Sequence, residues 1–139
     1  MRYGGRMEQP SVDTNTPYYR LGGPPVFEAI ANRFYDLMDS DPAYAELRAM
    51  HAPDLTPIRA SLPRFLIAWA GGPRDWFEQN PGRCMMSLHA PFTIEPLTAN
   101  QWAEAMERAI DDVAPQPAEI AASMREVLGR MARGMGRRG

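Results

Sequence analysis

Residues 24–38 read PPVFEAIANRFYDLM, and this stretch decides the fold class of the chain. Its apolar residues Val26, Ile30, Phe34 and Leu37 recur at helical spacing. Two prolines open the stretch, where a helix tolerates proline because the first backbone N–H groups have no partner inside the helix. The sequence DSDP at 39–42 then stops it. The stretch therefore predicts an amphipathic helix.

The same helical period continues toward the C-terminus. A short helical piece is expected at 42–50, and a third helix is expected to begin with Thr56 as its N-cap. Gly-Gly-Pro at 71–73 should end it. Pro63 lies inside this helix and predicts either a kink or an irregular start. The apolar face of this helix comprises Ile58, Leu62, Phe65, Leu66 and Trp69.

Two further long helices are expected near the C-terminus, after a short helix at 83–88. The sequence TANQ at 98–101 has the form of a capping box, with Thr98 as the cap and Gln101 three residues later. No segment alternates at period two for long enough to be a strand, so the fold class is all-α. The inward stripes comprise Trp102, Met106, Ala109, Ile110 and Val113, then, after Pro115 and Pro117, Ile120, Met124, Val127, Leu128 and Met131.

The length of 139 residues suits a single domain with a substantial core. We expect a flexible tail at 1–16, the domain at 17–133 and a second flexible tail at 134–139. The formal net charge of −2 gives no reason to expect nucleic acid as a partner. One cysteine excludes an internal disulfide, and no apolar run is long enough to span a membrane. We expect a cytoplasmic protein that is a monomer or a homodimer.

Basic residues cluster in the last helix and the tail. The cluster has two interpretations, a basic patch for a partner or the solvated end of a helix, and the second is the simpler one. Its members are Arg125, Arg130, Arg133, Arg137 and Arg138.

His89, in the sequence MMSLHAPF at 85–92, is one of only two histidines. An imidazole at a helix end among apolar side chains is able to ligate a buried flat cofactor such as haem. It also suits a structural histidine, because the helix dipole favours histidine near a C-terminus. The residue type alone leaves both interpretations open.

Several other kinds of site are excluded by the sequence. The glycine pairs at 22–23 and 71–72 are turn signals without the Lys-Ser/Thr of a phosphate-binding loop. One cysteine and two histidines are too few for a zinc site of the usual kind. Cys84 and His89 would face poorly as a nucleophile and base on one short helix.

Three aromatic side chains with polar atoms remain as candidates for a site: Tyr35, His51 and Trp102. Each also has a structural explanation. Tyr35 suits a boundary position with its hydroxyl in water, and His51 suits a surface loop. Trp102 suits an ordinary core position, because its apolar area alone favours burial.

Four stretches together resemble the truncated haemoglobins, and within them group II. They are PYYRLGG at 17–23, RFYDLM at 33–38, WAGGP at 69–73, and HAPF at 89–92 followed by Trp102. They occur in the family's order and with family-like spacing over residues 17 to about 113. The resemblance implies a two-over-two helical sandwich that holds one b-type haem.

The resemblance also implies a role for each polar candidate. His89 would be the proximal ligand of the haem iron. Tyr35, His51 and Trp102 would lie on the distal side, where Tyr35 and Trp102 would donate hydrogen bonds to a bound ligand. Ile58 and Leu62 would form the distal wall. Further contacts with the haem are expected from Phe34, Phe65, Leu66, Trp76, Met85, Leu88, Phe92 and Ile94.

The chain departs from the family pattern at two places. Residues 80–87, NPGRCMMS, lack the arginine-rich sequence common before the proximal histidine. Arg83, Arg64 or Trp76 would then replace it in contacts with the haem propionates. The second departure is Pro63, which stands where an ordinary helical residue is expected.

The function implied is reversible binding of O₂ and other diatomic ligands. Redox chemistry with O₂, NO or peroxide is a subsidiary expectation and would require a reductase. The alternative is a cofactor-free helical interaction module on a globin scaffold. A haem sensor is a third interpretation, but it would need an output domain.

Overall fold

The computed structural model describes residues 15–72 and 95–135. Within these ranges every regular element is helical, which confirms the all-α prediction. The elements in chain order are α1 (Pro17–Leu21), α2 (Pro24–Ser40), the 3₁₀ turn η2 (Pro42–Tyr44), α3 (Ala45–Ala49), α4 (Thr56–Trp69), α7 (Pro96–Val113) and α8 (Ala118–Met135).

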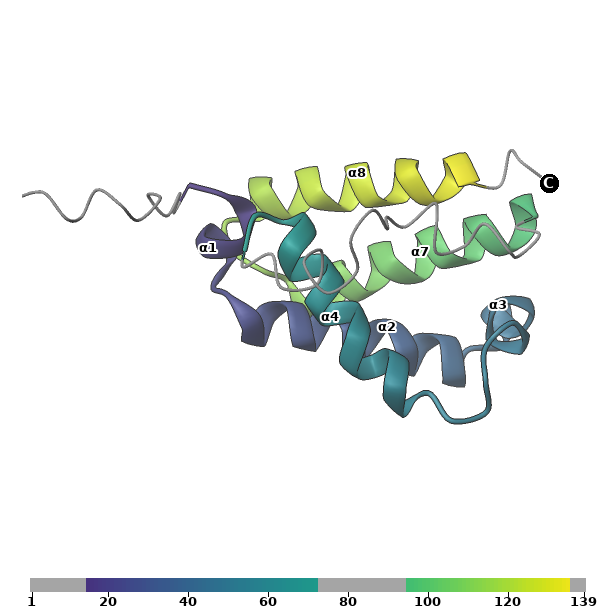
Figure 1. Ribbon diagram of the computed structural model, residues 1–139. Helices are drawn as coiled ribbons and strands as arrows, with labels where there is room; N and C mark the ends of the chain where they lie inside the picture. Colours follow the sequence, from purple (N-terminus) through teal and green to yellow (C-terminus); the bar gives the residue numbers. More distant parts are fainter. Residues whose placement is uncertain (1–14, 73–94, 136–139) are drawn as a thin grey trace, which may run out of the picture.

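The four long helices form two packed pairs (Figure 1). Helices α7 and α8 lie side by side and make the most extensive contact in the described chain. Helix α2 packs against α4 on one side and against α7 on the other, so it joins the two pairs. This is the two-over-two arrangement that the sequence predicts.

The core lies where α2 meets α4 and α7. Phe27, Ile30 and Phe34 repeat at helical spacing along α2 and are almost completely inaccessible to solvent. Met106 and Ile110 of α7 are buried to the same degree. The predicted inward stripes of both helices therefore meet in one core, although Trp102 and Val113 are only partly buried against it.

Helix α1 is fastened to the end of α4 through closely approaching backbone. The Tyr18 N–H donates to the Ala70 carbonyl at 3.0 Å. A Cβ atom on Gly72 would lie 2.7 Å from Ile67 Cγ2 and 2.8 Å from the Tyr18 ring, closer than packed carbon atoms approach. Only glycine therefore fits at position 72 without displacing these neighbours.

Both predicted N-caps are wrong. Thr56 is the first helical residue of α4, and Asp54 Oδ1 accepts its N–H at 3.0 Å. Helix α7 begins at Pro96, and the Thr98 hydroxyl donates to the Glu95 carbonyl instead of capping the helix. Proline at the first position starts α7 earlier because its fixed φ already suits a helix.

Other details of the helices also differ from expectation. Helix α4 runs from Thr56 through the buried Pro63 to Trp69, so of the two alternatives predicted for Pro63, a kink or an irregular start, the irregular start is absent. Val127, expected to face inward, is 38% exposed. Helix α8 extends to Met135, past the predicted domain end at 133, because the Met135 side chain is buried. None of the described helices is long and apolar enough to cross a membrane.

Candidate functional site

Tyr35 and Trp102 meet around the ring of Phe34. Phe34 is fully buried, and its ring centroid lies 4.9 Å from that of Tyr35 and 5.2 Å from that of Trp102. Both pairs are edge-to-face, the arrangement that aromatic quadrupoles favour. Tyr35 comes from α2 and Trp102 from α7, so the contact between these helices brings the two polar aromatics to one place.

The Tyr35 hydroxyl is buried and has no hydrogen bond to any residue in 15–72 or 95–135. The side chain is 5% exposed, and no described group donates to the hydroxyl or accepts from it. Burial raises the pKa of Tyr35 well above its ordinary value, and the charge of nearby Arg59 opposes that rise only partly. The hydroxyl is therefore a neutral donor held in an apolar setting, and the boundary position with the hydroxyl in water is wrong.

His51 lies between α3 and α4 and is partly buried. Its ring centroid is 6.3 Å from that of Tyr35, with the rings at 75°. Nδ1 lies 2.8 Å from the Leu47 carbonyl oxygen, which only accepts hydrogen bonds. Nδ1 therefore carries the proton, and in the neutral ring Nε2 holds a lone pair.

Apart from Phe34 of α2, the apolar candidates that the structure describes belong to α4. Phe65 and Leu66 are buried, whereas Ile58 and Leu62 pack against the core while partly exposed. His89 and the remaining candidates lie outside the described residues; these are Trp76, Arg83, Met85, Leu88, Phe92 and Ile94. The structure thus places Tyr35 beside Phe34 and His51, and Trp102 beside Phe34, whereas the proximal half of the site stays a prediction.

Arg59 of α4 is a neighbour of Tyr35 that the sequence analysis missed. Its guanidinium carbon is 5.9 Å from the Tyr35 ring centroid, within the range of a cation–π contact. Nη2 also donates to Asp36 Oδ1 at 2.9 Å and so joins α4 to α2 beside Tyr35. Tyr35 and Asp36 are adjacent in the chain and form no motif with Arg59, so the sequence does not predict this contact.

Arg48 of α3 organises the segment that carries His51. Its Nε donates to Asp39 Oδ1 at 2.8 Å, and its two terminal nitrogens donate to the carbonyls of Ala52 at 3.0 Å and Pro53 at 2.9 Å. One guanidinium thus ties the end of α2 to the loop after His51. The sequence holds no motif for it, because carbonyl acceptors are present at every residue.

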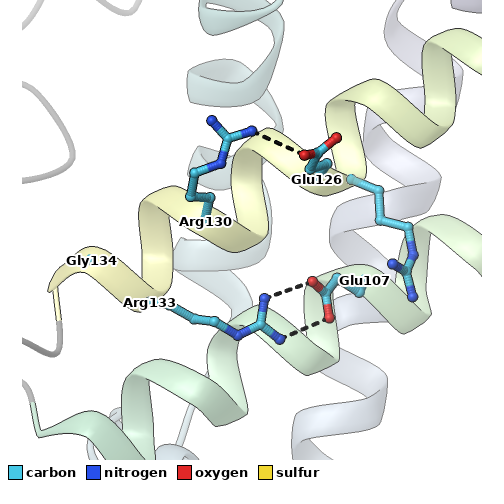
Figure 2. A pocket seen from close by; sticks show the side chains of 6 residues that line it. Glu107, Glu126, Arg130, Arg133 and Gly134 are labelled. Atoms are coloured by element: carbon cyan, nitrogen blue, oxygen red, sulfur yellow. Dashed lines mark hydrogen bonds and ion pairs between the residues drawn. The ribbon is translucent and has the colours of Figure 1, made fainter.

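A separate hollow lies over α7 and α8 and is strongly charged (Figure 2). Arg133 makes two bonds to Glu107, at 2.8 and 3.0 Å, and Arg130 pairs with Glu126 at 3.3 Å. Arg125, which also lines the hollow, pairs with Asp111 of α7. Each arginine is neutralised by a carboxylate, which supports the solvated helix end over a basic patch for these three residues.

Comparison with known proteins gives the family. The profile of the family described as "Bacterial-like globin" matches residues 16–136. The chain belongs to the bacterial-like globin family. This globin shares 34% identity, over 87% of its own length and 97% of the other chain, with the cold-adapted truncated haemoglobin from the Antarctic marine bacterium Pseudoalteromonas haloplanktis TAC125, at a TM-score of 0.81.

Two further solved structures agree with this. A group II 2-on-2 haemoglobin from the plant pathogen Agrobacterium tumefaciens is 29% identical over 91% of this chain and 97% of the other, with a TM-score of 0.82. A thermostable haemoglobin from the actinobacterium Thermobifida fusca is 31% identical over 86% and 95%, with a TM-score of 0.75. The resemblance to group II truncated haemoglobins and the two-over-two fold are thus confirmed.

Membership of the globin family implies a haem cofactor, and the described residues fit one. A buried tyrosine hydroxyl without a partner is costly in an apolar setting unless something else accepts its proton. The Trp102 indole N–H likewise has no hydrogen-bond partner in the described chain. Two unused donors beside one buried aromatic ring suit a pocket that receives a polar ligand.

Proposed function

We propose that this globin holds a b-type haem through His89 and binds O₂ and other diatomic ligands on the side of Tyr35. Haem iron, when bound, supplies the site at which such a ligand attaches. The observation that carries the proposal is the Tyr35 hydroxyl, which is 5% exposed and has no hydrogen bond within the described chain.

Tyr35 and Trp102 are proposed to donate hydrogen bonds to the ligand. Their ring positions are fixed by the same neighbour, Phe34, so neither donor has to be ordered when the ligand arrives. The raised pKa of Tyr35 keeps its proton in place throughout the neutral range. A hydrogen bond to a group with charged character contributes about 1.5–3 kcal/mol, so two donors favour slow ligand release.

His51 is proposed to act on the same side in a different way. Its Nδ1–H is engaged by the Leu47 carbonyl, and Nε2 of the neutral ring is an acceptor. His51 therefore contributes a lone pair beside two donors. A pocket containing both donors and an acceptor is suited to moving protons as well as to holding a ligand.

The remaining predicted residues are proposed to complete the cofactor site. Phe34, Ile58, Leu62, Phe65 and Leu66 would supply apolar surface on the distal side. Redox chemistry with O₂, NO or peroxide would also require an electron donor, which we assign to a separate reductase. His89 would hold the metal, and further contacts with the haem would come from Trp76, Met85, Leu88, Phe92 and Ile94.

The test is O₂ release, measured by stopped-flow displacement with CO in the wild-type protein and in Tyr35→Phe. The variant keeps the ring that packs on Phe34 and removes only the hydroxyl. Loss of a donor contributing about 1.5–3 kcal/mol predicts release roughly 10- to 100-fold faster. An unchanged rate would remove Tyr35 from the ligand site.

A further inference from the structure

Gln101 is a buried polar side chain directly next to Trp102 on α7. It is 8% exposed and, tyrosines apart, is the one buried polar or charged residue of the described chain. Its amide crosses to α3: Oε1 accepts the Leu47 N–H at 3.0 Å, and Nε2 donates to Glu46 Oε1 at 2.8 Å. The hydrogen bond that Gln101 Nε2 donates lowers the pKa of Glu46 below its ordinary value.

The two partners fix the orientation of the Gln101 amide. A backbone N–H only donates and a carboxylate only accepts, so a flipped amide would place like groups together at both contacts. Leu47 is the third residue of α3, and the N–H groups of a first helical turn have no acceptor inside their own helix. Leu47 is also buried, so Gln101 replaces the water that would otherwise accept its N–H.

Leu47 connects this bond to His51. The same residue that donates its N–H to Gln101 offers its carbonyl oxygen to His51 Nδ1, 2.8 Å away. Helix α3 has only five residues, too few to be stable by itself, so the orientation of the Leu47 carbonyl depends on what holds α3 in place. Gln101 provides that contact from α7.

We propose that Gln101 is a positioning residue for His51: by anchoring Leu47 it holds the imidazole in its Nδ1–H form, which makes Nε2 an acceptor in a ring whose centroid lies 6.3 Å from that of Tyr35. The significance for ligand chemistry rests on the proposed function, because it makes His51 an acceptor among donors. The hydrogen-bond geometry that sets the tautomer belongs to the chain itself and does not depend on a cofactor.

The arrangement also explains why the predicted capping box does not form. In a capping box the glutamine side chain returns to the start of its own helix. Here the Gln101 side chain has two better-placed partners on α3, one of them a buried N–H that no solvent reaches. The Gln101 side chain therefore links α7 to α3 instead of capping its own helix.

The tautomer of His51 is measured by two-dimensional ¹H–¹⁵N NMR of the imidazole nitrogens in the reduced, CO-saturated protein. The chain has two histidines, so a His51→Asn sample assigns the signals. We expect Nδ1 of wild-type His51 to carry the proton. In Gln101→Leu, we expect this form to lose its dominance and the Nε2–H form, which free histidine favours, to appear.

Two further variants separate positioning from general loosening of the fold. Glu46→Ala removes only the second partner of Gln101 and should leave the tautomer unchanged. The exchange Gln101→Glu with Glu46→Gln keeps an acceptor for the Leu47 N–H and a donor opposite it, so it should retain the Nδ1–H form. This exchange also tests the proposal if Gln101→Leu does not fold.

An Nε2–H tautomer in the wild-type protein would overturn the proposal, as would an unchanged tautomer in a folded Gln101→Leu variant. A tautomer lost in the exchange variant would count against it equally. Failure of the haem assignment is distinguishable, because it would appear as a missing haem absorption band. The imidazole signals would then be read from the same samples without cofactor.

Discussion

The rings of Phe34 and Trp102 lie edge-to-face with their centroids 5.2 Å apart, and this contact joins α2 to α7 at the candidate ligand site. Phe34 is fully buried, whereas Trp102 is only partly buried and its indole N–H has no hydrogen-bond partner in the described chain. The contact with Phe34 therefore fixes the position of the Trp102 indole N–H, although no described residue accepts a hydrogen bond from it.

Replacing Trp102 with leucine should speed O₂ release. The substitution removes an indole donor, and losing about 1.5–3 kcal/mol corresponds to release roughly 10- to 100-fold faster. Stopped-flow displacement by CO gives the rate. Trp69→Leu makes the same change at a partly buried tryptophan at the end of α4 and should alter the rate little. Equal rates in Trp102→Leu and wild type would refute the donor role.

Removing the hydroxyls of two buried tyrosines should have different consequences for stability. Tyr44 is fully buried and its hydroxyl accepts from Arg108 Nη1 at 2.9 Å, so Tyr44→Phe should lower the free energy of unfolding by about 1 kcal/mol. Tyr35→Phe removes a hydroxyl that no described residue partners, and should be neutral or slightly stabilising. Urea unfolding of the cofactor-free protein measures both. An equal loss of unfolding free energy in the two variants would contradict the conclusion that the Tyr35 hydroxyl makes no hydrogen bond to the described residues.

Acid should remove a stabilising contribution from Asp41. Arg108 donates to Asp41 Oδ2 and the Ala43 N–H donates to Oδ1, and both bonds hold the pKa of Asp41 below its ordinary value. Because the folded-state pKa is the lower one, the contribution is complete above the unfolded value of about 3.9 and disappears as pH falls through the folded value.

The measurement is the melting temperature of the wild-type protein and of Asp41→Asn across the acid range. The difference between them should be greatest near neutral pH and should shrink below about pH 4. A difference that is as large at pH 2 as at pH 7 would mean that the ionised form of Asp41 contributes nothing to folding.

The join between α1 and α4 should not tolerate even a methyl group. In Gly72→Ala the new Cβ would lie 2.7 Å from Ile67 Cγ2 and 2.8 Å from the Tyr18 ring, and relieving such overlap typically costs about 1–3 kcal/mol. Gly134→Ala is the matched control, because nothing lies within 4 Å of its Cβ and the residue is helical. It should stabilise by ~0.5 kcal/mol. Thermal unfolding tests both, and a harmless Gly72→Ala would show that the join is loose.

The sequence predicts much of this fold because its signals are local. Apolar spacing in 24–38 marks the buried face of α2, with Phe34 fully buried as expected. The two N-caps were wrong because a threonine before a helix is only one of several ways to satisfy the first N–H groups. At Thr56 the acceptor is Asp54, and at α7 the proline at position 96 sets the start.

The candidate site was predictable only in part, because local signals indicate residue types but not contacts between distant segments. Residue type and family resemblance predict Tyr35, His51 and Trp102 as site residues, and the fold places the Tyr35 ring close to those of Phe34 and His51. Gln101 and Arg59 act through partners far away in the sequence, such as the Leu47 N–H for Gln101 and Asp36 for Arg59. Contacts of this kind depend on the assembled fold and leave no periodicity or motif.

The central claim is that this globin holds haem through His89, and the absorption spectrum tests it most directly. The purified protein, reduced and then exposed to CO, should show a Soret band that shifts on adding CO. In His89→Ala this band should be lost, whereas His51→Ala should retain it. No Soret band after reconstitution with haem, or an unchanged spectrum in His89→Ala, would contradict the account.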